Sequence, residues 1–301
     1  MFEFGLKKAR MVLNIIYRAY QVKTHLYKYV HAQNGNAPQH RHIPASVKKG
    51  SLEHQTFLFF ANLLTYHSQS DQGFLQVKNL FENRPELFSP HLIFSDLREL
   101  QNGLKSVGFL YPNEGGRRWH ISGTTLFREH EGSPVTLFKG VKSIDHLLKK
   151  HRWGKKNYGF VGLGPKLWSL LAIFYEELEI SPNIPGAFPV DIHVQAECIG
   201  LGLVKSQKEL IETTRLAEFI RGYISRICRE EKMSALDLSH AMWFLGNRVC
   251  SPICRRNQGQ AEYLCPVYAY CEGRISTKLY AARGKWKLND YRQKNDEPNL
   301  F

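Results

Sequence analysis

Apolar residues recur at helical spacing over most of this chain of 301 residues. The spacing predicts helices over residues 6–30, 52–71, 73–85, 91–109 and 169–178. Runs in which β-branched and polar residues alternate are scarce, so few strands are expected. A polar linker at 31–49 and a loop at 110–120 separate the predicted helices. The pattern therefore predicts an all-α fold, long enough for one large domain or two lobes.

Charge gathers at the two ends of the chain. The net charge is +14 at pH 7, and residues 1–50 carry nine Lys or Arg against one acidic residue. Residues 274–301 carry seven against three, which leaves the middle of the chain nearly neutral. Basic ends of this kind predict a polyanionic partner. The alternative is a pair of solvated ends that only keep the protein soluble.

No stretch reaches the roughly 20 apolar residues that a bilayer-spanning helix needs, and no secretion signal is recognised. We therefore expect a protein that is not membrane-bound or secreted. In a reducing compartment its six cysteines would bind metal or stay free rather than form disulfides.

Four of the six cysteines fall within 22 residues, in the segment CSPICRRNQGQAEYLCPVYAYC. Three, ten and five residues separate Cys250, Cys254, Cys265 and Cys271. Neither pair has the Cys-x2-Cys spacing that zinc sites favour. Four clustered thiols suit a 4Fe–4S cluster, which takes one thiolate per iron, whereas zinc and unliganded cysteines stay open as alternatives.

The stretch FVGLGPKLW places two glycines, a proline and a lysine directly before the helical run at 169–178. A turn at Gly162 and Gly164 would expose backbone N–H groups, and the following helix would add the positive end of its dipole. Pro165 suits the first helical position. Such a turn can bind a nucleic-acid phosphate without reading sequence. It can equally be an ordinary helix–helix turn.

A second stretch, FPVDIHVQAECIGLGL, places Asp191 directly before another helix-like run. Asp191 is expected to be the N-cap of that helix, where its carboxylate accepts backbone N–H bonds and stays ionised. That structural role does not exclude a functional one.

Together these stretches resemble the helix-hairpin-helix superfamily of DNA glycosylases, nearest to its endonuclease III branch, over about residues 52–272. FVGLGPK is similar to the family's hairpin motif, with Val161 where proline is usual. PVDIHV is similar to its Val-Asp-x-His motif, with Ile192 where threonine is common. GNRVC and CPVYAYC resemble the two ends of its iron–sulfur loop, and the motifs follow one another in the family's order.

Two features depart from the family pattern. The linker SPNIPGAF, between the lysine and the aspartate, is longer than the family norm. The position of Cys254 also differs, because the second and third cysteines of the family loop lie close together. Cys250, Cys265 and Cys271 are thus the firmer ligand assignments.

The resemblance implies roles for individual residues. Lys166 would be the nucleophile, its amine kept neutral by burial at a helix N-terminus, and Asp191 would stabilise positive charge on the sugar. The implied DNA contacts are the hairpin glycines Gly162 and Gly164 and the loop residues Gln69 and Tyr111, with Leu110 as an alternative to Tyr111. The alternative for Lys166 is an exposed residue that only touches a phosphate.

The implied organisation has four parts. Residues 1–50 would be a basic extension and linker, and 51–248 the two-lobed glycosylase core with Lys166 and Asp191 in the groove between its lobes. Residues 249–273 would form the iron–sulfur loop, and 274–301 a basic tail that clamps DNA without affecting the chemistry.

The implied activity is that of a DNA glycosylase with AP lyase activity, an enzyme of base excision repair. It would act on double-stranded DNA as a monomer, in the cytoplasm with the nucleoid or in the nucleus. Three alternatives stay open: a monofunctional glycosylase with an Asp-activated water, a catalytically silent DNA-binding module and a zinc-stapled interaction protein. The sequence does not identify the base.

Overall fold

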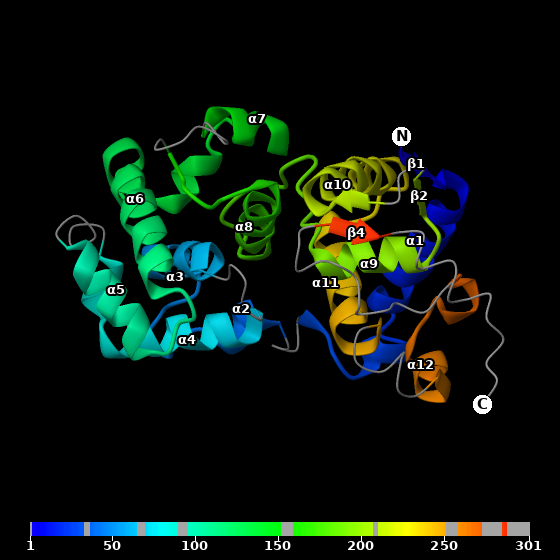
Figure 1. Ribbon diagram of the computed structural model, residues 1–301, viewed down its shortest axis with the longest axis horizontal. Helices are drawn as coiled ribbons and strands as arrows, with labels where there is room; N and C mark the ends of the chain where they lie inside the picture. The colour runs from blue at the N-terminus through cyan, green and yellow to red at the C-terminus, as the bar shows by residue number, and fades with distance from the viewer. Residues whose placement is uncertain are drawn as a thin grey trace. The chain divides into compact units, whose positions relative to one another are not determined.

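The computed structural model describes residues 2–32, 37–64, 70–89, 96–151, 159–206, 210–250, 258–272 and 285–287. The chain divides into two compact units (Figure 1). One, here called the middle unit, consists of residues 35–187. The other, the terminal unit, is built from both ends of the chain, residues 1–34 and 188–301.

Seven helices are described in the middle unit. They are α2 (Pro38–Arg41), α3 (Leu52–Leu64), α4 (Ser70–Asn83), α5 (Leu97–Ser106), α6 (Pro112–His130), α7 (Ile144–Lys150) and α8 (Pro165–Glu177). The apolar helix α3 packs against α4, α6 and α8, and α5 packs along α6. Because neighbours cover α3 on several sides, ten of its residues are buried, and it forms the centre of the core.

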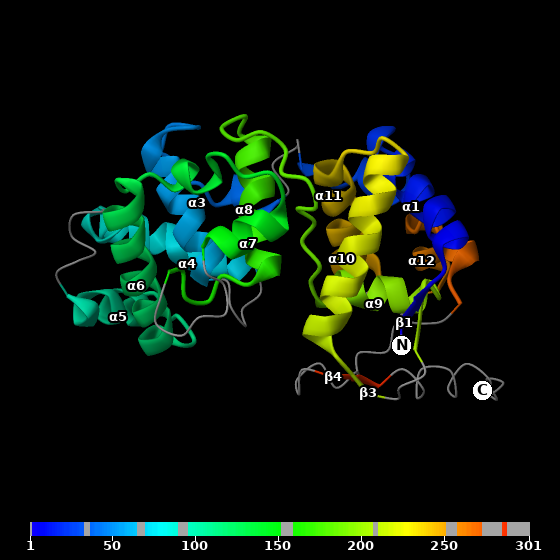
Figure 2. The ribbon, with the colours of Figure 1, turned by 90° about the horizontal axis from the view of Figure 1, so that it is seen from above.

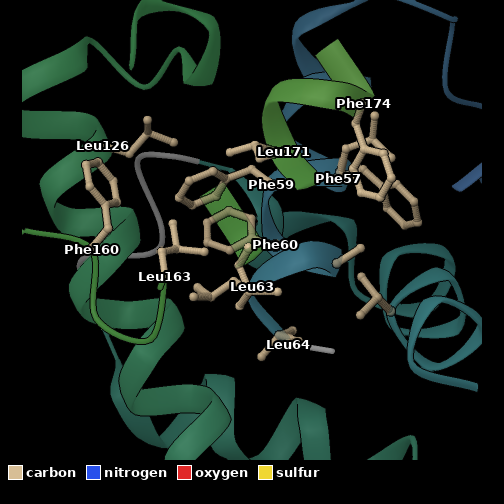
Figure 3. Close-up of a cluster of buried hydrophobic side chains, with 14 of the residues drawn as sticks. Phe57, Phe59, Phe60, Leu63, Leu64, Leu126, Phe160, Leu163, Leu171 and Phe174 are labelled. Carbon is tan, nitrogen blue, oxygen red and sulfur yellow. The ribbon is translucent and has the colours of Figure 1, made fainter. Parts of the chain in front are cut away.

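Aromatic rings fill this core (Figure 3). Phe60 of α3 stacks on Trp119 of α6 with 4.6 Å between ring centroids. Phe160, in the turn that leads into α8, meets Phe59 edge-on at 5.8 Å. The same rings that stabilise the unit therefore also support the turn before α8.

The terminal unit contains β1 (Phe2–Phe4), α1 (Leu6–Gln21), α9 (Ile192–Gly200), β2 (Val204–Ser206), β3 (Leu210–Glu212), α10 (Thr213–Glu230), α11 (Ala235–Leu245), α12 (Gln258–Leu264) and β4 (Lys285–Lys287). β1 pairs antiparallel with β2, and β3 pairs antiparallel with β4. The apolar face of α1 packs on α11 (Figure 2). Residues close to the N-terminus are thus an integral part of this unit, whereas the sequence indicated a separate extension over 1–50.

The prediction of a mostly helical chain is confirmed, although several predicted boundaries differ. The linker predicted over 31–49 contains α2, the helix predicted over 52–71 ends at Leu64, and the one predicted over 91–109 begins at Leu97. The helix predicted over 6–30 ends at Gln21, because Lys23 and His25 adopt positive φ values of 55° and 53°. The loop predicted over 110–120 is largely the start of α6. Gly116 lies there because α5 approaches closely: a Cβ at this position would be 2.6 Å from Cγ of Gln101.

No helix in the described ranges is both long enough and apolar enough to cross a membrane.

Candidate functional site

The glycine turn before α8, Gly162–Gly164, is tight and is called the hairpin below. Gly162 has φ +91°, which L side chains rarely adopt, and the Gly164 N–H donates to its carbonyl at 3.2 Å. Leu163, between the glycines, is buried and belongs to the aromatic core cluster (Figure 3). Gly164 is the N-cap of α8 and Pro165 is its first residue, as predicted.

A positive side chain lies against the hairpin. A Cβ on Gly162 would be 3.0 Å from Cδ and 3.1 Å from Nη1 of Arg118. Arg118 donates to Glu114 at 2.7 Å, and Arg117 donates to the same carboxylate twice at 2.9 Å. The hydrogen bonds from Arg117, and then those from Arg118, lower the pKa of Glu114 to about 2. An ionised Glu114 therefore fixes Arg118 beneath the turn.

Lys166 is exposed in the first turn of α8, whereas Leu167 and Trp168 beside it are buried. The expected burial of its amine is therefore not found. α8 itself is fixed at this end, because the buried amide of Asn62 on α3 donates to the Leu167 carbonyl at 2.9 Å. An exposed amine on a fixed helix N-terminus can reach a phosphate or a sugar that comes to the hairpin.

Asp191 caps α9, as the sequence predicted. Its Oδ1 accepts the Val194 N–H at 2.9 Å, and its main-chain carbonyl accepts the Gln195 N–H at 3.0 Å. The side chain is half-buried. Residues 194–200 of α9 are buried, whereas Ile192 at its start is exposed, so the capped end of this buried helix lies near the surface.

A second carboxyl group, that of Glu197, lies buried on α9. Burial and then the charge of Asp191 raise the pKa of Glu197 well above its ordinary value, and a contact with the Gly246 main chain opposes this in part. A Cβ on Gly246 would be only 2.4 Å from Oε1 of Glu197. Burial therefore favours the protonated form of the Glu197 carboxyl group.

The predicted site residues fall into both units. Gly162, Gly164 and Lys166 belong to the middle unit, and Asp191 belongs to the terminal unit. Tyr111, also in the middle unit, precedes α6 and is about half exposed, as is expected of a side chain that contacts DNA. Gln69 lies outside the described residues.

Three of the four predicted metal ligands are described, and Cys254 is not. Cys250 ends a π-helical turn, Gly246–Cys250, and Cys265 follows α12. Burial raises the pKa of the Tyr27 hydroxyl most, and the charge of Glu197 comes next. The charges of Cys265 and Cys250 add smaller effects in the same direction. The Cys271 thiol donates to the Gly200 carbonyl at 3.3 Å.

These thiols suit iron in their chemistry, but the described residues include no group of three or more His, Cys, Asp or Glu side chains that could hold a metal ion. A thiolate ligand has no proton, so metal binding at Cys271 would also replace its hydrogen bond to Gly200. The cluster therefore stays a prediction.

No model of a known protein family matches the chain, and no curated protein sequence matches it. The likeness to the glycosylase superfamily thus rests on the sequence motifs alone.

Three residues that contact the predicted site residues or their helices were not predicted from the sequence: Arg118, Glu197 and Trp286. Glu197 had a visible signal, because it is a lone carboxyl in the apolar run VQAECIGLGL. Trp286 also had one, because it is the only tryptophan of residues 274–301 and stands between two lysines. The sequence contains no such signal for Arg118, because only the fold brings it close to Gly162.

Gly162→Ala is expected to lower the free energy of unfolding by about 1–3 kcal/mol, because it strains the backbone and pushes on Arg118. Gly50→Ala is the matched control: Gly50 has φ +80°, but a Cβ there would meet no atom within 4 Å. Urea denaturation should therefore show a larger loss for Gly162→Ala. Equal losses would contradict a close contact between the hairpin and Arg118.

Proposed function

We propose that this protein is a DNA glycosylase that removes a damaged or modified base, and that it also cleaves the resulting abasic site through a lysine imine. The observation that carries the proposal is the hairpin: a glycine at φ +91°, a glycine N-cap, and an exposed lysine in the first turn of a buried helix. Helix N-termini of this kind bind phosphate through backbone N–H groups.

The hairpin would bind one phosphate of the DNA backbone. Pro165 has no N–H, and the N–H groups of the residues that follow it point out of the first turn of α8. The guanidinium of Arg118 beside Gly162 adds positive charge at the same place. Such contacts hold a duplex in register without reading its sequence.

The proposed chemistry uses Lys166 and Asp191. The target nucleotide must leave the duplex, because its glycosidic bond is unreachable in the base stack. The exposed ammonium group of Lys166 would first release a proton to water. The resulting neutral amine would then form a bond to C1′ while the bond from C1′ to the base breaks. The base leaves with the bonding electrons and takes a proton, and Asp191 accepts the proton that the amine loses.

The carboxylate of Asp191 would also stabilise positive charge on the sugar while the bond breaks. Its fixed direction suits this role, because the Val194 N–H holds one oxygen at the end of a buried helix. Loss of the second amine proton and opening of the sugar ring would give the imine. Removal of a C2′ proton then expels the 3′ phosphate and nicks the strand.

The exposure of Lys166 favours one second candidate, a monofunctional glycosylase. In that mechanism Lys166 contacts a phosphate and Asp191 activates a water molecule that attacks C1′. The two mechanisms differ in whether enzyme and DNA become covalently joined.

We also propose a 4Fe–4S cluster held by Cys250, Cys254, Cys265 and Cys271. Its support is the density of thiols in one segment of the sequence. The cluster would shape a loop of the terminal unit and take no part in bond breaking.

Borohydride trapping tests the lysine. Duplex DNA with an abasic site should become crosslinked to the protein, because borohydride reduces an imine to a stable amine. Lys166→Gln should abolish the crosslink, whereas Lys105→Gln, which removes another exposed lysine of the middle unit, should leave it unchanged. Base release without crosslinking, at a normal rate in Lys166→Gln, would contradict the imine and favour the monofunctional mechanism.

Asp191→Asn tests the carboxylate. Asparagine caps a helix about as well as aspartate, so the variant removes charge and keeps the cap. Base release should slow by about 100- to 1000-fold while DNA binding persists. Asp96→Asn is the matched control, because Asp96 caps α5 by accepting the Arg98 N–H at 2.8 Å. Equal rates in the two variants would remove Asp191 from the mechanism.

Metal analysis tests the cluster. Protein purified without oxygen should contain about four iron and four sulfide ions per chain. Cys265→Ser should lose iron. Cys228→Ala should keep it, because Cys228 is buried in α10, where burial raises the pKa of its thiol to about 12. Stoichiometric zinc without iron would contradict the assignment.

A further inference from the structure

A short part of the basic C-terminal tail is built into the terminal unit. β4 pairs antiparallel with β3, and Trp286 lies opposite Ile211 in this register. The Trp286 side chain is 1% exposed, whereas Lys285 beside it is exposed. A strand of three residues forms few backbone hydrogen bonds, so burial of the indole ring must supply much of the energy that holds it.

The indole ring is hydrogen-bonded to α9, the helix that Asp191 caps. Nε1 of Trp286 donates to Oε1 of Gln195 at 2.6 Å, and both side chains are buried. The main-chain N–H of Gln195 donates to the Asp191 carbonyl at 3.0 Å, in the first turn of α9. Gln195 thus connects Trp286 of the tail with Asp191.

Trp286 and Gln195 each depend on the hydrogen bond between them. A buried indole N–H or amide oxygen that loses its hydrogen bond destabilises the fold, because water cannot replace the lost partner. Without Trp286, the Gln195 amide would have to turn out of the core, and the first turn of α9 would loosen with it. The order of this turn is therefore linked to the docking of the tail.

We propose that Trp286 is a positioning residue, which docks the tail on Gln195 and so holds the Asp191 carboxylate in its working direction. The proposal rests on the proposed catalytic role of Asp191. It changes the expectation for residues 274–301: the tail affects the rate of the chemistry, and is more than a clamp that acts through its charge.

The test uses the full chain with Trp286→Phe, which keeps an aromatic ring and removes the N–H, and with Gln195→Met, which removes the acceptor. Amide hydrogen exchange in residues 192–200 should become about tenfold faster in each, the change expected from losing one buried hydrogen bond. The double variant should differ little from either single one, because both remove the same contact.

Single-turnover base release at saturating DNA should slow by a similar factor in both variants, with DNA affinity unchanged. The matched control is Trp243→Phe, the same substitution on α11 of this unit, where the ring packs on Phe244 at 5.1 Å. It should leave both the exchange of 192–200 and the release rate unchanged.

Unchanged amide exchange of residues 192–200 in Trp286→Phe would contradict the claim that Trp286 holds α9. Faster exchange with a normal rate of base release would contradict the positioning role. If the wild-type protein releases no base from any altered duplex, the proposed function fails, and with it the link to catalysis. Exchange in 192–200 still decides separately whether Trp286 holds α9.

Discussion

The burial of α9 is the constraint on which the terminal unit depends. Polar groups on a buried helix need partners from the protein, and here these partners come from later parts of the chain. Trp286 meets Gln195, the Cys271 thiol meets the Gly200 carbonyl, and the π-helical turn that begins at Gly246 packs on a buried carboxyl group of α9. One helix therefore holds the tail and two parts of the cysteine segment, while its first turn presents a carboxylate.

In the middle unit, different contacts hold the turn that precedes Lys166. Its hairpin is supported by apolar packing, with Leu163 in the cluster around α3. Asn62 adds one buried hydrogen bond to the first turn of α8, and Arg118 fills the space that a side chain at position 162 would need. The exposed Lys166 therefore stands on a rigid base, which the proposed attack on a sugar carbon requires.

The predictions from local sequence were correct where a single residue determines the backbone geometry. The helix start at Pro165 and the cap at Asp191 follow from the chemistry of those residues, and both are found. Long-range packing was not predictable in the same way. The periodicity of α1 indicated an apolar face but not that α11 covers it, and the glycines of α6 suggested a loop although α5 requires them. Trp286 was read as part of a charged tail because its partner Gln195 lies 91 positions away.

Base release from DNA is the activity on which the roles of Lys166 and Asp191 both depend. It is tested most directly with a panel of duplexes that each carry one altered base, among them oxidised pyrimidines, oxidised purines, mismatched thymine and deliberately modified bases. The wild-type protein should release at least one of these bases, leaving an abasic site that it then nicks. Binding to every duplex with no base released from any of them would contradict a glycosylase and leave a DNA-binding module in its place.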